Sequence, residues 1–160
     1  MTLKIVKDRV GAVLKGVRAL TTKEVLVGIP STTAGRTDTP INNAEIGYLM
    51  ETGSPAQNIP ERPFLVPGVE SSQAKFTPHL KAAGLSALEG KTALVERDFD
   101  RAGFVAANAV KAKITEGPFT PLSPKTLQKR RAKGRTGERP LIDTGQLRRA
   151  VTHVVRKKGS

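Results

Sequence analysis

Apolar residues that recur every three or four positions predict that most of this chain is helical, because that spacing places them on one helix face. The first such run extends from about Leu3 to Leu20. Gly11 and Gly16 lie off its apolar stripe, and each weakens a helix by about 1 kcal/mol relative to alanine. We therefore expect this helix to depend on packing, either against the protein's own sheet or in a short coiled coil. The stripe consists of Leu3, Val6, Val10, Val13, Val17 and Leu20.

The middle of the chain contains two more helical runs. Residues 68–89 form the first, and Pro78 is expected to split it near Phe76–Thr77, because proline removes an amide donor and crowds the preceding turn. The second, from Lys91 to Thr115, is the longest in the chain, about 37 Å at 1.5 Å per residue. Gly117-Pro118 ends it. Its narrow, alanine-rich stripe suits either a core helix or a helix between subunits, and consists of Val95, Phe99, Ala102, Ala106 and Ala109.

Two short runs rich in β-branched residues predict strands near the two ends of the chain. Residues Glu24–Ile29 form one, and Val151 to about Lys157 form the other, which can pair with it. Together with the helices, these strands predict an α+β fold in which helices pack on a small, mostly antiparallel sheet, with a long helical segment in the middle of the chain. We expect a single domain over residues 1–160, with a core of about 1–66 and 116–156 and a helical insertion at about 67–115.

A short helix is predicted to begin at Asn42, which is a good N-cap. Glu45 lies three residues further on, where its side chain can reach back to the N–H of the cap residue. Gly53 stands where a helix end needs a residue in the left-handed region. The polar loop before this helix, residues 31–40, is expected to be a mobile arm that becomes ordered only on assembly. The apolar face of the helix consists of Ile46, Leu49 and Met50.

A proline-rich arm follows this helix. Pro55, Pro60 and Pro63 should hold it extended, since proline fixes its own backbone and biases the preceding residue away from helix. The arm ends in Arg62–Leu65, and a stiff arm loses little entropy on docking against another protein. Alternatively, Phe64 anchors the arm to the chain's own core.

The C-terminal third begins with a strongly basic helix. Ser123 is a good N-cap and Pro124 a good first residue, and the helix should end at about Lys133. This basic segment is either a solvated or protein-docking surface, or a patch that contacts DNA phosphates without reading sequence. Its residues are Lys125, Lys129, Arg130, Arg131, Lys133, Arg135 and Arg139.

A later turn, Asp143–Gln146, has capping-box spacing, so Asp143 is expected to cap a short helix. Leu141 and Leu147 can pin that turn to the body.

Charge is distributed unevenly over this sequence of 160 residues and net charge +13. Residues 91–160 carry seventeen Lys or Arg against six Asp or Glu, and residues 1–90 carry ten against eight. Such a field favours a polyanion or an acidic protein surface as a neighbour. The lack of cysteine excludes disulfides and thiolate metal sites, the scarcity of aromatic residues weakens a base-stacking role, and no apolar run approaches the length of a membrane helix.

The sequence gives little support for catalysis. His79 and His153 are far apart and have no metal-ligand or triad partner nearby in the sequence. No nucleophile-elbow, zinc-protease, EF-hand or phosphate-loop motif occurs. We therefore expect no catalytic residue, no metal and no cofactor.

Three ordered segments resemble a family of tailed bacteriophages, the tail-completion or head-to-tail joining proteins of the neck. They are N-A-E-I-G-Y-L-M-E-T-G-S-P, I-P-E-R-P-F-L and P-L-I-D-T-G-Q-L-R-R-A-V-T. Members typically show an Asn-Ala-Glu start, an acidic-x-Gly helix end, an I-P-x-R-P-F-L arm and a late L-x-D-T-G-x-L turn. The resemblance spans roughly residues 25–156, and the helical middle is longer here than in the shortest members.

This resemblance implies a structural virion protein, made in the bacterial cytoplasm, that forms a ring in the neck and lets DNA pass through its centre. Its expected partners are further copies of itself, in a hexamer, the head-side connector or stopper protein, the tail terminator or tail tube protein, and the packaged double-stranded DNA. A sequence-nonspecific DNA-binding protein and a morphogenesis factor absent from the virion remain alternatives. The residues expected at a protein interface are Leu49, Glu51, Arg62, Pro63, Phe64 and Leu65.

Overall fold

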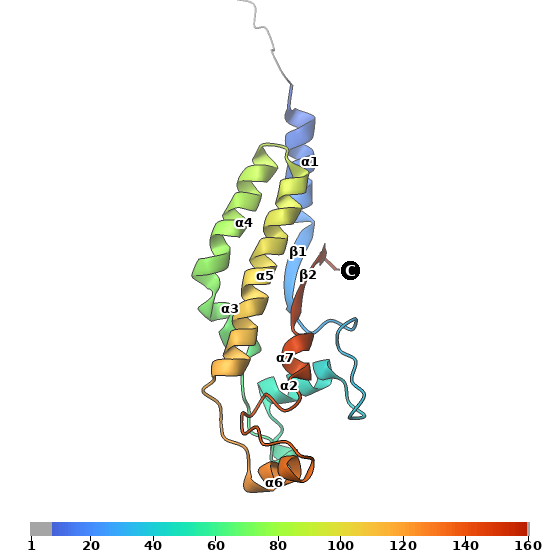
Figure 1. Cartoon of the computed structure of the whole chain (residues 1–160). Coiled ribbons are helices and arrows are strands. Elements are labelled where there is room, and N and C mark those ends of the chain that lie inside the picture. Colours follow the sequence, from blue (N-terminus) through green and yellow to red (C-terminus); the bar gives the residue numbers. More distant parts are fainter. Residues whose placement is uncertain (1–7, 160) are drawn as a thin grey trace, which may run out of the picture.

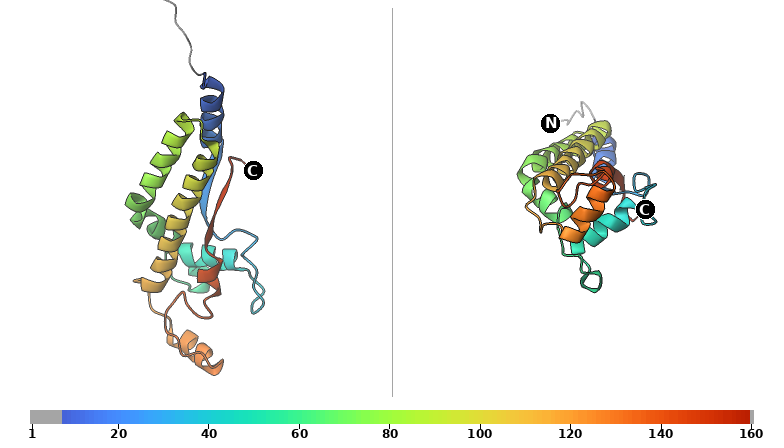
Figure 2. Two further views of the ribbon diagram at one scale, coloured as in Figure 1. Left: turned by 45° about the horizontal axis from the view of Figure 1, so that its top comes forward. Right: turned by 60° about the horizontal axis from the view of Figure 1, so that its bottom comes forward.

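The computed structural model describes residues 8–159, which form an elongated α+β fold (Figure 1). Its longer helices run side by side along the long axis, and the shorter ones gather at one end (Figures 1 and 2). The helices are α1 (Val10–Thr21), α2 (Asn43–Thr52), α3 (Leu65–Ser71), α4 (Gln73–Leu88), α5 (Thr92–Glu116), α6 (Pro124–Ala132) and α7 (Gln146–Ala150). The strands are β1 (Lys23–Gly28) and β2 (Thr152–Lys157), and a short 3₁₀ helix, η1, covers Pro55–Gln57.

The two strands form an antiparallel sheet, as the sequence predicts. Val25 lies opposite Val155, and Leu26 lies opposite Val154. Because side chains alternate along a strand, Val25, Val27 and Val155 face the core, whereas Leu26 and Val154 point outward and remain 40% and 37% exposed. One face of the sheet is thus covered by α5, and the other is open in the described part of the chain.

Helix α5 is the central element and is a core helix, with α1, α3, α4 and both strands packed around it. The predicted stripe is buried at Val95, Phe99, Ala102 and Ala106, and only half-buried at Ala109. Two clusters of buried side chains lie along its length. The upper core comprises Ala83, Ala87, Val95 and Phe99, and the lower core comprises Phe64, Val110, Ile114, Leu141, Leu147 and Val151.

The segment predicted as a helical insertion packs closely with the predicted core. Val110 and Ile114 from the predicted insertion pack with Leu141 and Val151 from the predicted core in one cluster. The segment at 67–115 is therefore part of the fold's centre.

The break between α3 and α4 falls at Ser72, not near Phe76–Thr77 as predicted from Pro78. Ser72 is buried, and its hydroxyl donates to the Val69 carbonyl at 2.8 Å, which closes the end of α3. Pro78 lies inside α4 on an exposed side of the helix, so water can solvate the carbonyl that its missing N–H leaves unpaired.

Helix α1 begins at Val10, and the predicted start at Leu3 and Val6 lies outside the described residues. Gly16 is its buried residue, and a Cβ added there would lie 2.3 Å from the Ala87 carbonyl oxygen. The glycine that weakens the isolated helix thus allows α1 to approach the backbone of α4.

Candidate functional site

The three segments that carry the family resemblance meet at the end of the molecule that contains α2, the arm and α7. Ile46 and Met50 of α2 and Leu65 of the arm pack against the lower core, to which Phe64 and Leu147 belong. The pins predicted at Leu141 and Leu147 are confirmed, since each is 5% exposed. We call this unit, residues 42–66 and 140–150, the joining lobe.

Local signals in the sequence set the start of α2. The Asn42 side chain accepts hydrogen bonds from the N–H groups of Ala44 (2.8 Å) and Glu45 (3.0 Å). In return, the Glu45 carboxylate accepts the Asn42 N–H at 2.7 Å. The predicted capping box is confirmed. Gly53 ends the helix with φ +70°, and a Cβ there would lie 2.9 Å from the Glu61 nitrogen.

Glu51 holds the arm onto α2. Its carboxylate accepts three backbone hydrogen bonds at the start of α3, from Phe64 (2.7 Å), Leu65 (2.8 Å) and Val66 (3.0 Å). These are N–H groups that a helix start leaves without an intrahelical partner, and they favour a negative charge. Glu51 was expected at a protein interface, and it instead caps a neighbouring helix of its own chain.

The arm is extended only in its second half. Pro55–Gln57 form η1, and Asn58 has a left-handed backbone with φ +53°. The Ser54 N–H donates to the Ile59 carbonyl at 2.8 Å, and the Ile59 N–H donates to the Ser54 carbonyl at 3.0 Å. The prediction of an extended loop from Pro55 onward is therefore wrong for this closed turn.

Phe64 is internal, so the prediction that its side chain meets another protein is wrong, and Arg62 is largely buried by its own chain. Phe64 is 2% exposed and belongs to the lower core, which is the alternative that the sequence left open. Arg62 is 5% exposed and donates to the carbonyls of Thr120 (2.8 Å) and Pro121 (3.1 Å). The arm thus ties α2 to the segment before α6. Of the predicted interface residues, Pro63 is exposed, and Leu49 and Leu65 are half-buried.

The basic helix α6 has the predicted N-cap, because the Ser123 hydroxyl accepts the Thr126 N–H at 3.3 Å. Arg130 was expected to contact DNA or an acidic neighbour, and that prediction is wrong. It is 9% exposed, and one of its terminal nitrogens donates to the carbonyls of Gly137 (2.9 Å), Arg139 (2.9 Å) and Ile142 (3.0 Å). Arg130 therefore organises the loop between α6 and α7.

Three other basic residues of this segment are engaged within the chain. Arg135 pairs with Asp143 at 2.5 Å, Arg131 pairs with Glu138 at 3.1 Å, and Arg139 donates to a carbonyl at the end of α5. The predicted cap at Asp143 is wrong, since this carboxylate serves Arg135 and Arg130, and Gly145 begins α7 without a side-chain cap. In the described part of the chain, Lys125, Lys129 and Lys133 are exposed and have no ion pair.

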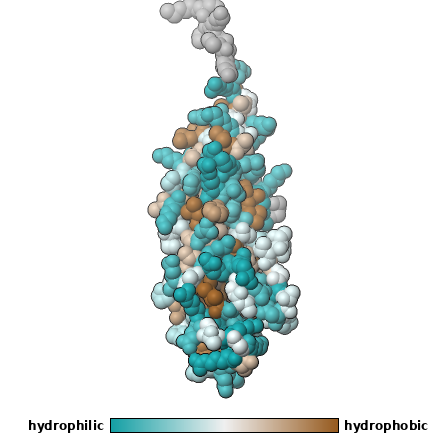
Figure 3. Space-filling model, viewed as in Figure 1, coloured by the Kyte–Doolittle hydropathy of each residue, from teal (hydrophilic) through white to brown (hydrophobic). Residues whose placement is uncertain are grey.

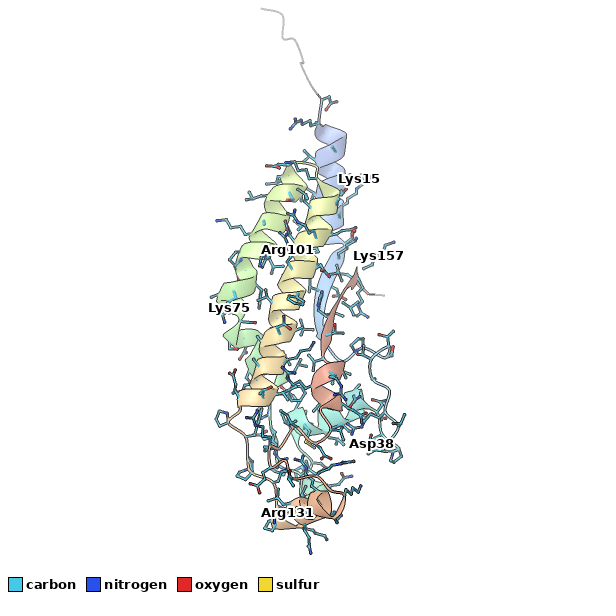
Figure 4. The ribbon with its side chains drawn as sticks, in the orientation of Figure 1. Lys15, Asp38, Lys75, Arg101, Arg131 and Lys157 are labelled. Carbon is cyan, nitrogen blue, oxygen red and sulfur yellow. The ribbon has the colours of Figure 1, made fainter. Side chains whose placement is uncertain are left out.

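Basic side chains are not confined to α6. Figure 4 shows Lys15, Lys75, Arg101, Arg131 and Lys157 at different heights along the molecule. Basic side chains therefore lie along the length of the molecule as well as on α6.

The loop at 31–40 makes defined contacts with the joining lobe, in contrast to the mobile arm that the sequence predicts. Asn43 is buried, and its N–H donates to the Ala34 carbonyl at 2.7 Å. Arg36 donates to the Asn43 side chain and to both Asp38 oxygens, each at 2.9 Å. The hydrogen bonds from Arg36 hold the pKa of Asp38 below its ordinary value of 3.8.

A pocket of about 420 Å³ lies between α2, the arm, α6 and the start of α7. Its lining includes apolar side chains from all three resemblance segments, together with Arg36, Arg62 and Arg130. Thr144 also lines it, and the buried hydroxyl of this residue has no hydrogen-bond partner in the described residues.

Neither His79 nor His153 lines this pocket. His153 Nε2 is 2.8 Å from the exposed Asp100 carboxylate, and its ring packs against Gly103 on α5. Among residues 8–159, no group of three or more His, Asp or Glu side chains is placed to hold a metal ion.

Comparisons of the chain with protein-family models, curated proteins and solved structures give no match. Within residues 8–159, no helix has both the length and the apolar character needed to cross a membrane.

Proposed function

We propose that this chain is a head-to-tail joining protein of a tailed bacteriophage neck, where it forms a ring and acts by adhesion. The observation that carries the proposal is the joining lobe. Segments separated by about a hundred residues in the sequence, each of which resembles the same family, pack around one cluster that contains Phe64, Leu141 and Leu147. A chance likeness of three short motifs would not require them to meet.

Outward-facing apolar surfaces also support an adhesive role. Ile41, Tyr48 and Leu49 line a shallow hollow on the outer side of α2, and Tyr48 is 69% exposed. The open face of the sheet presents Leu26 and Val154. Figure 3 shows separate apolar patches on an otherwise largely hydrophilic face. Exposed apolar patches bordered by polar residues are typical of protein interaction sites.

Deletion of the gene tests the proposal. A phage that lacks this protein should accumulate filled heads and free tails, and expression of the protein from a plasmid should restore joined particles. Mass spectrometry of purified virions should find the protein, and a structure of the neck should place it in a ring. Joined, infectious particles from the deletion would refute the proposal.

A point substitution tests the adhesive surface. Tyr48→Asp places a charge on the hollow of α2 without disturbing the core, so it should block joining while the protein stays folded. Tyr48→Phe keeps the aromatic side chain and serves as the matched control. Equal infectivity of the two variants would exclude this hollow as a contact.

Sequence-nonspecific DNA binding is the second candidate function, favoured by the exposed lysines of α6. A gel-shift titration across salt concentrations measures it, because each neutralised phosphate steepens the log–log slope by about one. Replacing Lys125, Lys129 and Lys133 with Gln should lower that slope by about three. An unchanged slope would show that these lysines contact no DNA.

A further inference from the structure

The pocket of the joining lobe contains more positive charge than its neighbouring carboxylates balance. Arg36 is matched by Asp38. Arg130 and Arg135 share the single carboxylate of Asp143, at 3.6 and 2.5 Å. Arg62 has no acidic partner within ion-pair distance in the described part of the chain. The pocket therefore carries an excess of one to two positive charges.

Arg62 is the focus of that excess. Burial lowers its pKa, and the nearby charge of Arg130 lowers it further. Its Nε and Nη2 atoms donate to backbone carbonyls, but Nη1 contacts only the Met50 sulfur, at 4.0 Å. A thioether is a weak acceptor. A charged group that is 5% exposed and incompletely paired is costly to the fold unless an anion completes it.

Thr144 is a second, independent sign of a ligand. Its Oγ1 atom is fully buried and has no hydrogen-bond partner in the described residues, and the residue lines the same pocket as Arg62. Buried hydroxyls nearly always have a partner. Thus Thr144 and Arg62, two residues that line the pocket, each have a hydrogen-bonding group without a full set of partners in the described residues.

We propose that this pocket binds the carboxylate of an acidic residue that lies between apolar residues in a partner polypeptide. Arg62 supplies the charge and Thr144 a hydrogen bond. Apolar side chains, among them Ile46, Ile59 and Leu122, receive the residues that flank the carboxylate. A single carboxylate fits the small charge excess better than a phosphate group, which carries more negative charge, and the apolar part of the lining suits a peptide. This proposal does not depend on a role in the phage neck.

A titration followed by nuclear magnetic resonance of the ¹⁵N-labelled full chain tests it. The probe is acetyl-Leu-Asp-Leu-amide, and its control is acetyl-Leu-Asn-Leu-amide, which has the same shape without the charge. The Asp peptide should cause saturable shifts of the Arg62 Nε–H and Thr144 amide signals and bind at least about tenfold more tightly than the Asn peptide. Equal binding of the two peptides, or shifts elsewhere, would overturn the proposal.

Two further arms separate other ligands. Inorganic phosphate and 4-methylpentanoate are titrated in the same way. If phosphate binds more tightly than the Asp peptide, the site is an anion site of a different kind. If the free carboxylate binds as tightly as the peptide, the apolar flanks contribute nothing and the partner is no polypeptide. Either outcome contradicts the proposal.

Substitutions assign the binding to this pocket. Thr144→Val removes one hydrogen bond at nearly constant volume and should weaken the Asp peptide about tenfold. Thr136→Val, in the exposed loop after α6, is the control and should leave affinity unchanged. Arg62→Gln should abolish binding, but Arg62 also holds the segment before α6, so Thr144→Val carries the test. An unaltered affinity in Thr144→Val would refute the assignment.

Discussion

Substitution of Gly16 by alanine sets two effects of opposite sign against each other. Alanine is the better helix former and should stabilise α1 by about 0.5–1 kcal/mol. However, the added Cβ would lie 2.3 Å from the carbonyl oxygen of Ala87 and 3.0 Å from its carbonyl carbon and Cα. These are backbone atoms of a neighbouring helix, so relief requires α1 to move away from α4.

The clash should prevail. Forcing an extra carbon into a close-packed contact costs about 1–3 kcal/mol. Gly16→Ala is therefore expected to lower the free energy of unfolding by up to about 2.5 kcal/mol, the largest difference between the two terms. Gly11 lies in the same helix with nothing within 4 Å of its added Cβ. Gly11→Ala should therefore show the propensity term alone and raise stability by up to about 1 kcal/mol.

Urea denaturation followed by far-ultraviolet circular dichroism measures both variants. The reasoning requires opposite signs, with the midpoint of Gly16→Ala below that of the wild type and the midpoint of Gly11→Ala at or above it. If both substitutions stabilise the protein equally, α1 is not packed on the end of α4 as the structure has it. A change in the slope of either curve would instead indicate a different unfolded or native state.

Three further substitutions examine the joining lobe and the loop at 31–40 that contacts it. Glu51→Gln should destabilise the protein by about 2–4 kcal/mol, because an amide cannot accept all three N–H groups that the carboxylate accepts. Calorimetry measures this loss, and Glu61→Gln, at an exposed position, is the control that should leave the stability nearly unchanged. Phe64→Ala should cost about 3–5 kcal/mol through the cavity left in the lower core, and a variant as stable as wild type in urea would contradict the buried position. Since Arg36 lowers the pKa of Asp38, this pair contributes stability above the ordinary pKa of 3.8, and the contribution is lost as pH falls through the lower folded-state value. Carboxyl ¹³C titration should find the Asp38 pKa depressed in the wild type and raised in Arg36→Gln, and identical curves would exclude the pair.

Features encoded within a few residues were predictable from the sequence. The capping box of Asn42, the serine cap of α6, the end of α5 at Gly117 and the two strands all depend on local chemistry or on a simple alternation. The fold class follows from these elements.

Features that depend on distant backbone atoms were not predictable. The seven basic residues at 125–139 have similar sequence contexts, and only the path of the loop after α6 places carbonyl groups around the guanidinium of Arg130. Likewise, a proline-stiffened arm can point toward the core or away from it, and Glu51 determines the direction by binding the N–H groups next to Phe64. Asp143 has the spacing of a cap, but its carboxylate pairs with Arg135 and Arg130 and does not cap α7.

Pairing of β1 with β2 links residues 23–28 to residues 152–157. During synthesis, β1 leaves the ribosome more than a hundred residues before its partner β2. Until β2 emerges, Val25 and Val27 lack the strand that pairs with them and can join the wrong chain. A polypeptide cut short before residue 152 should therefore aggregate even though every helix is present.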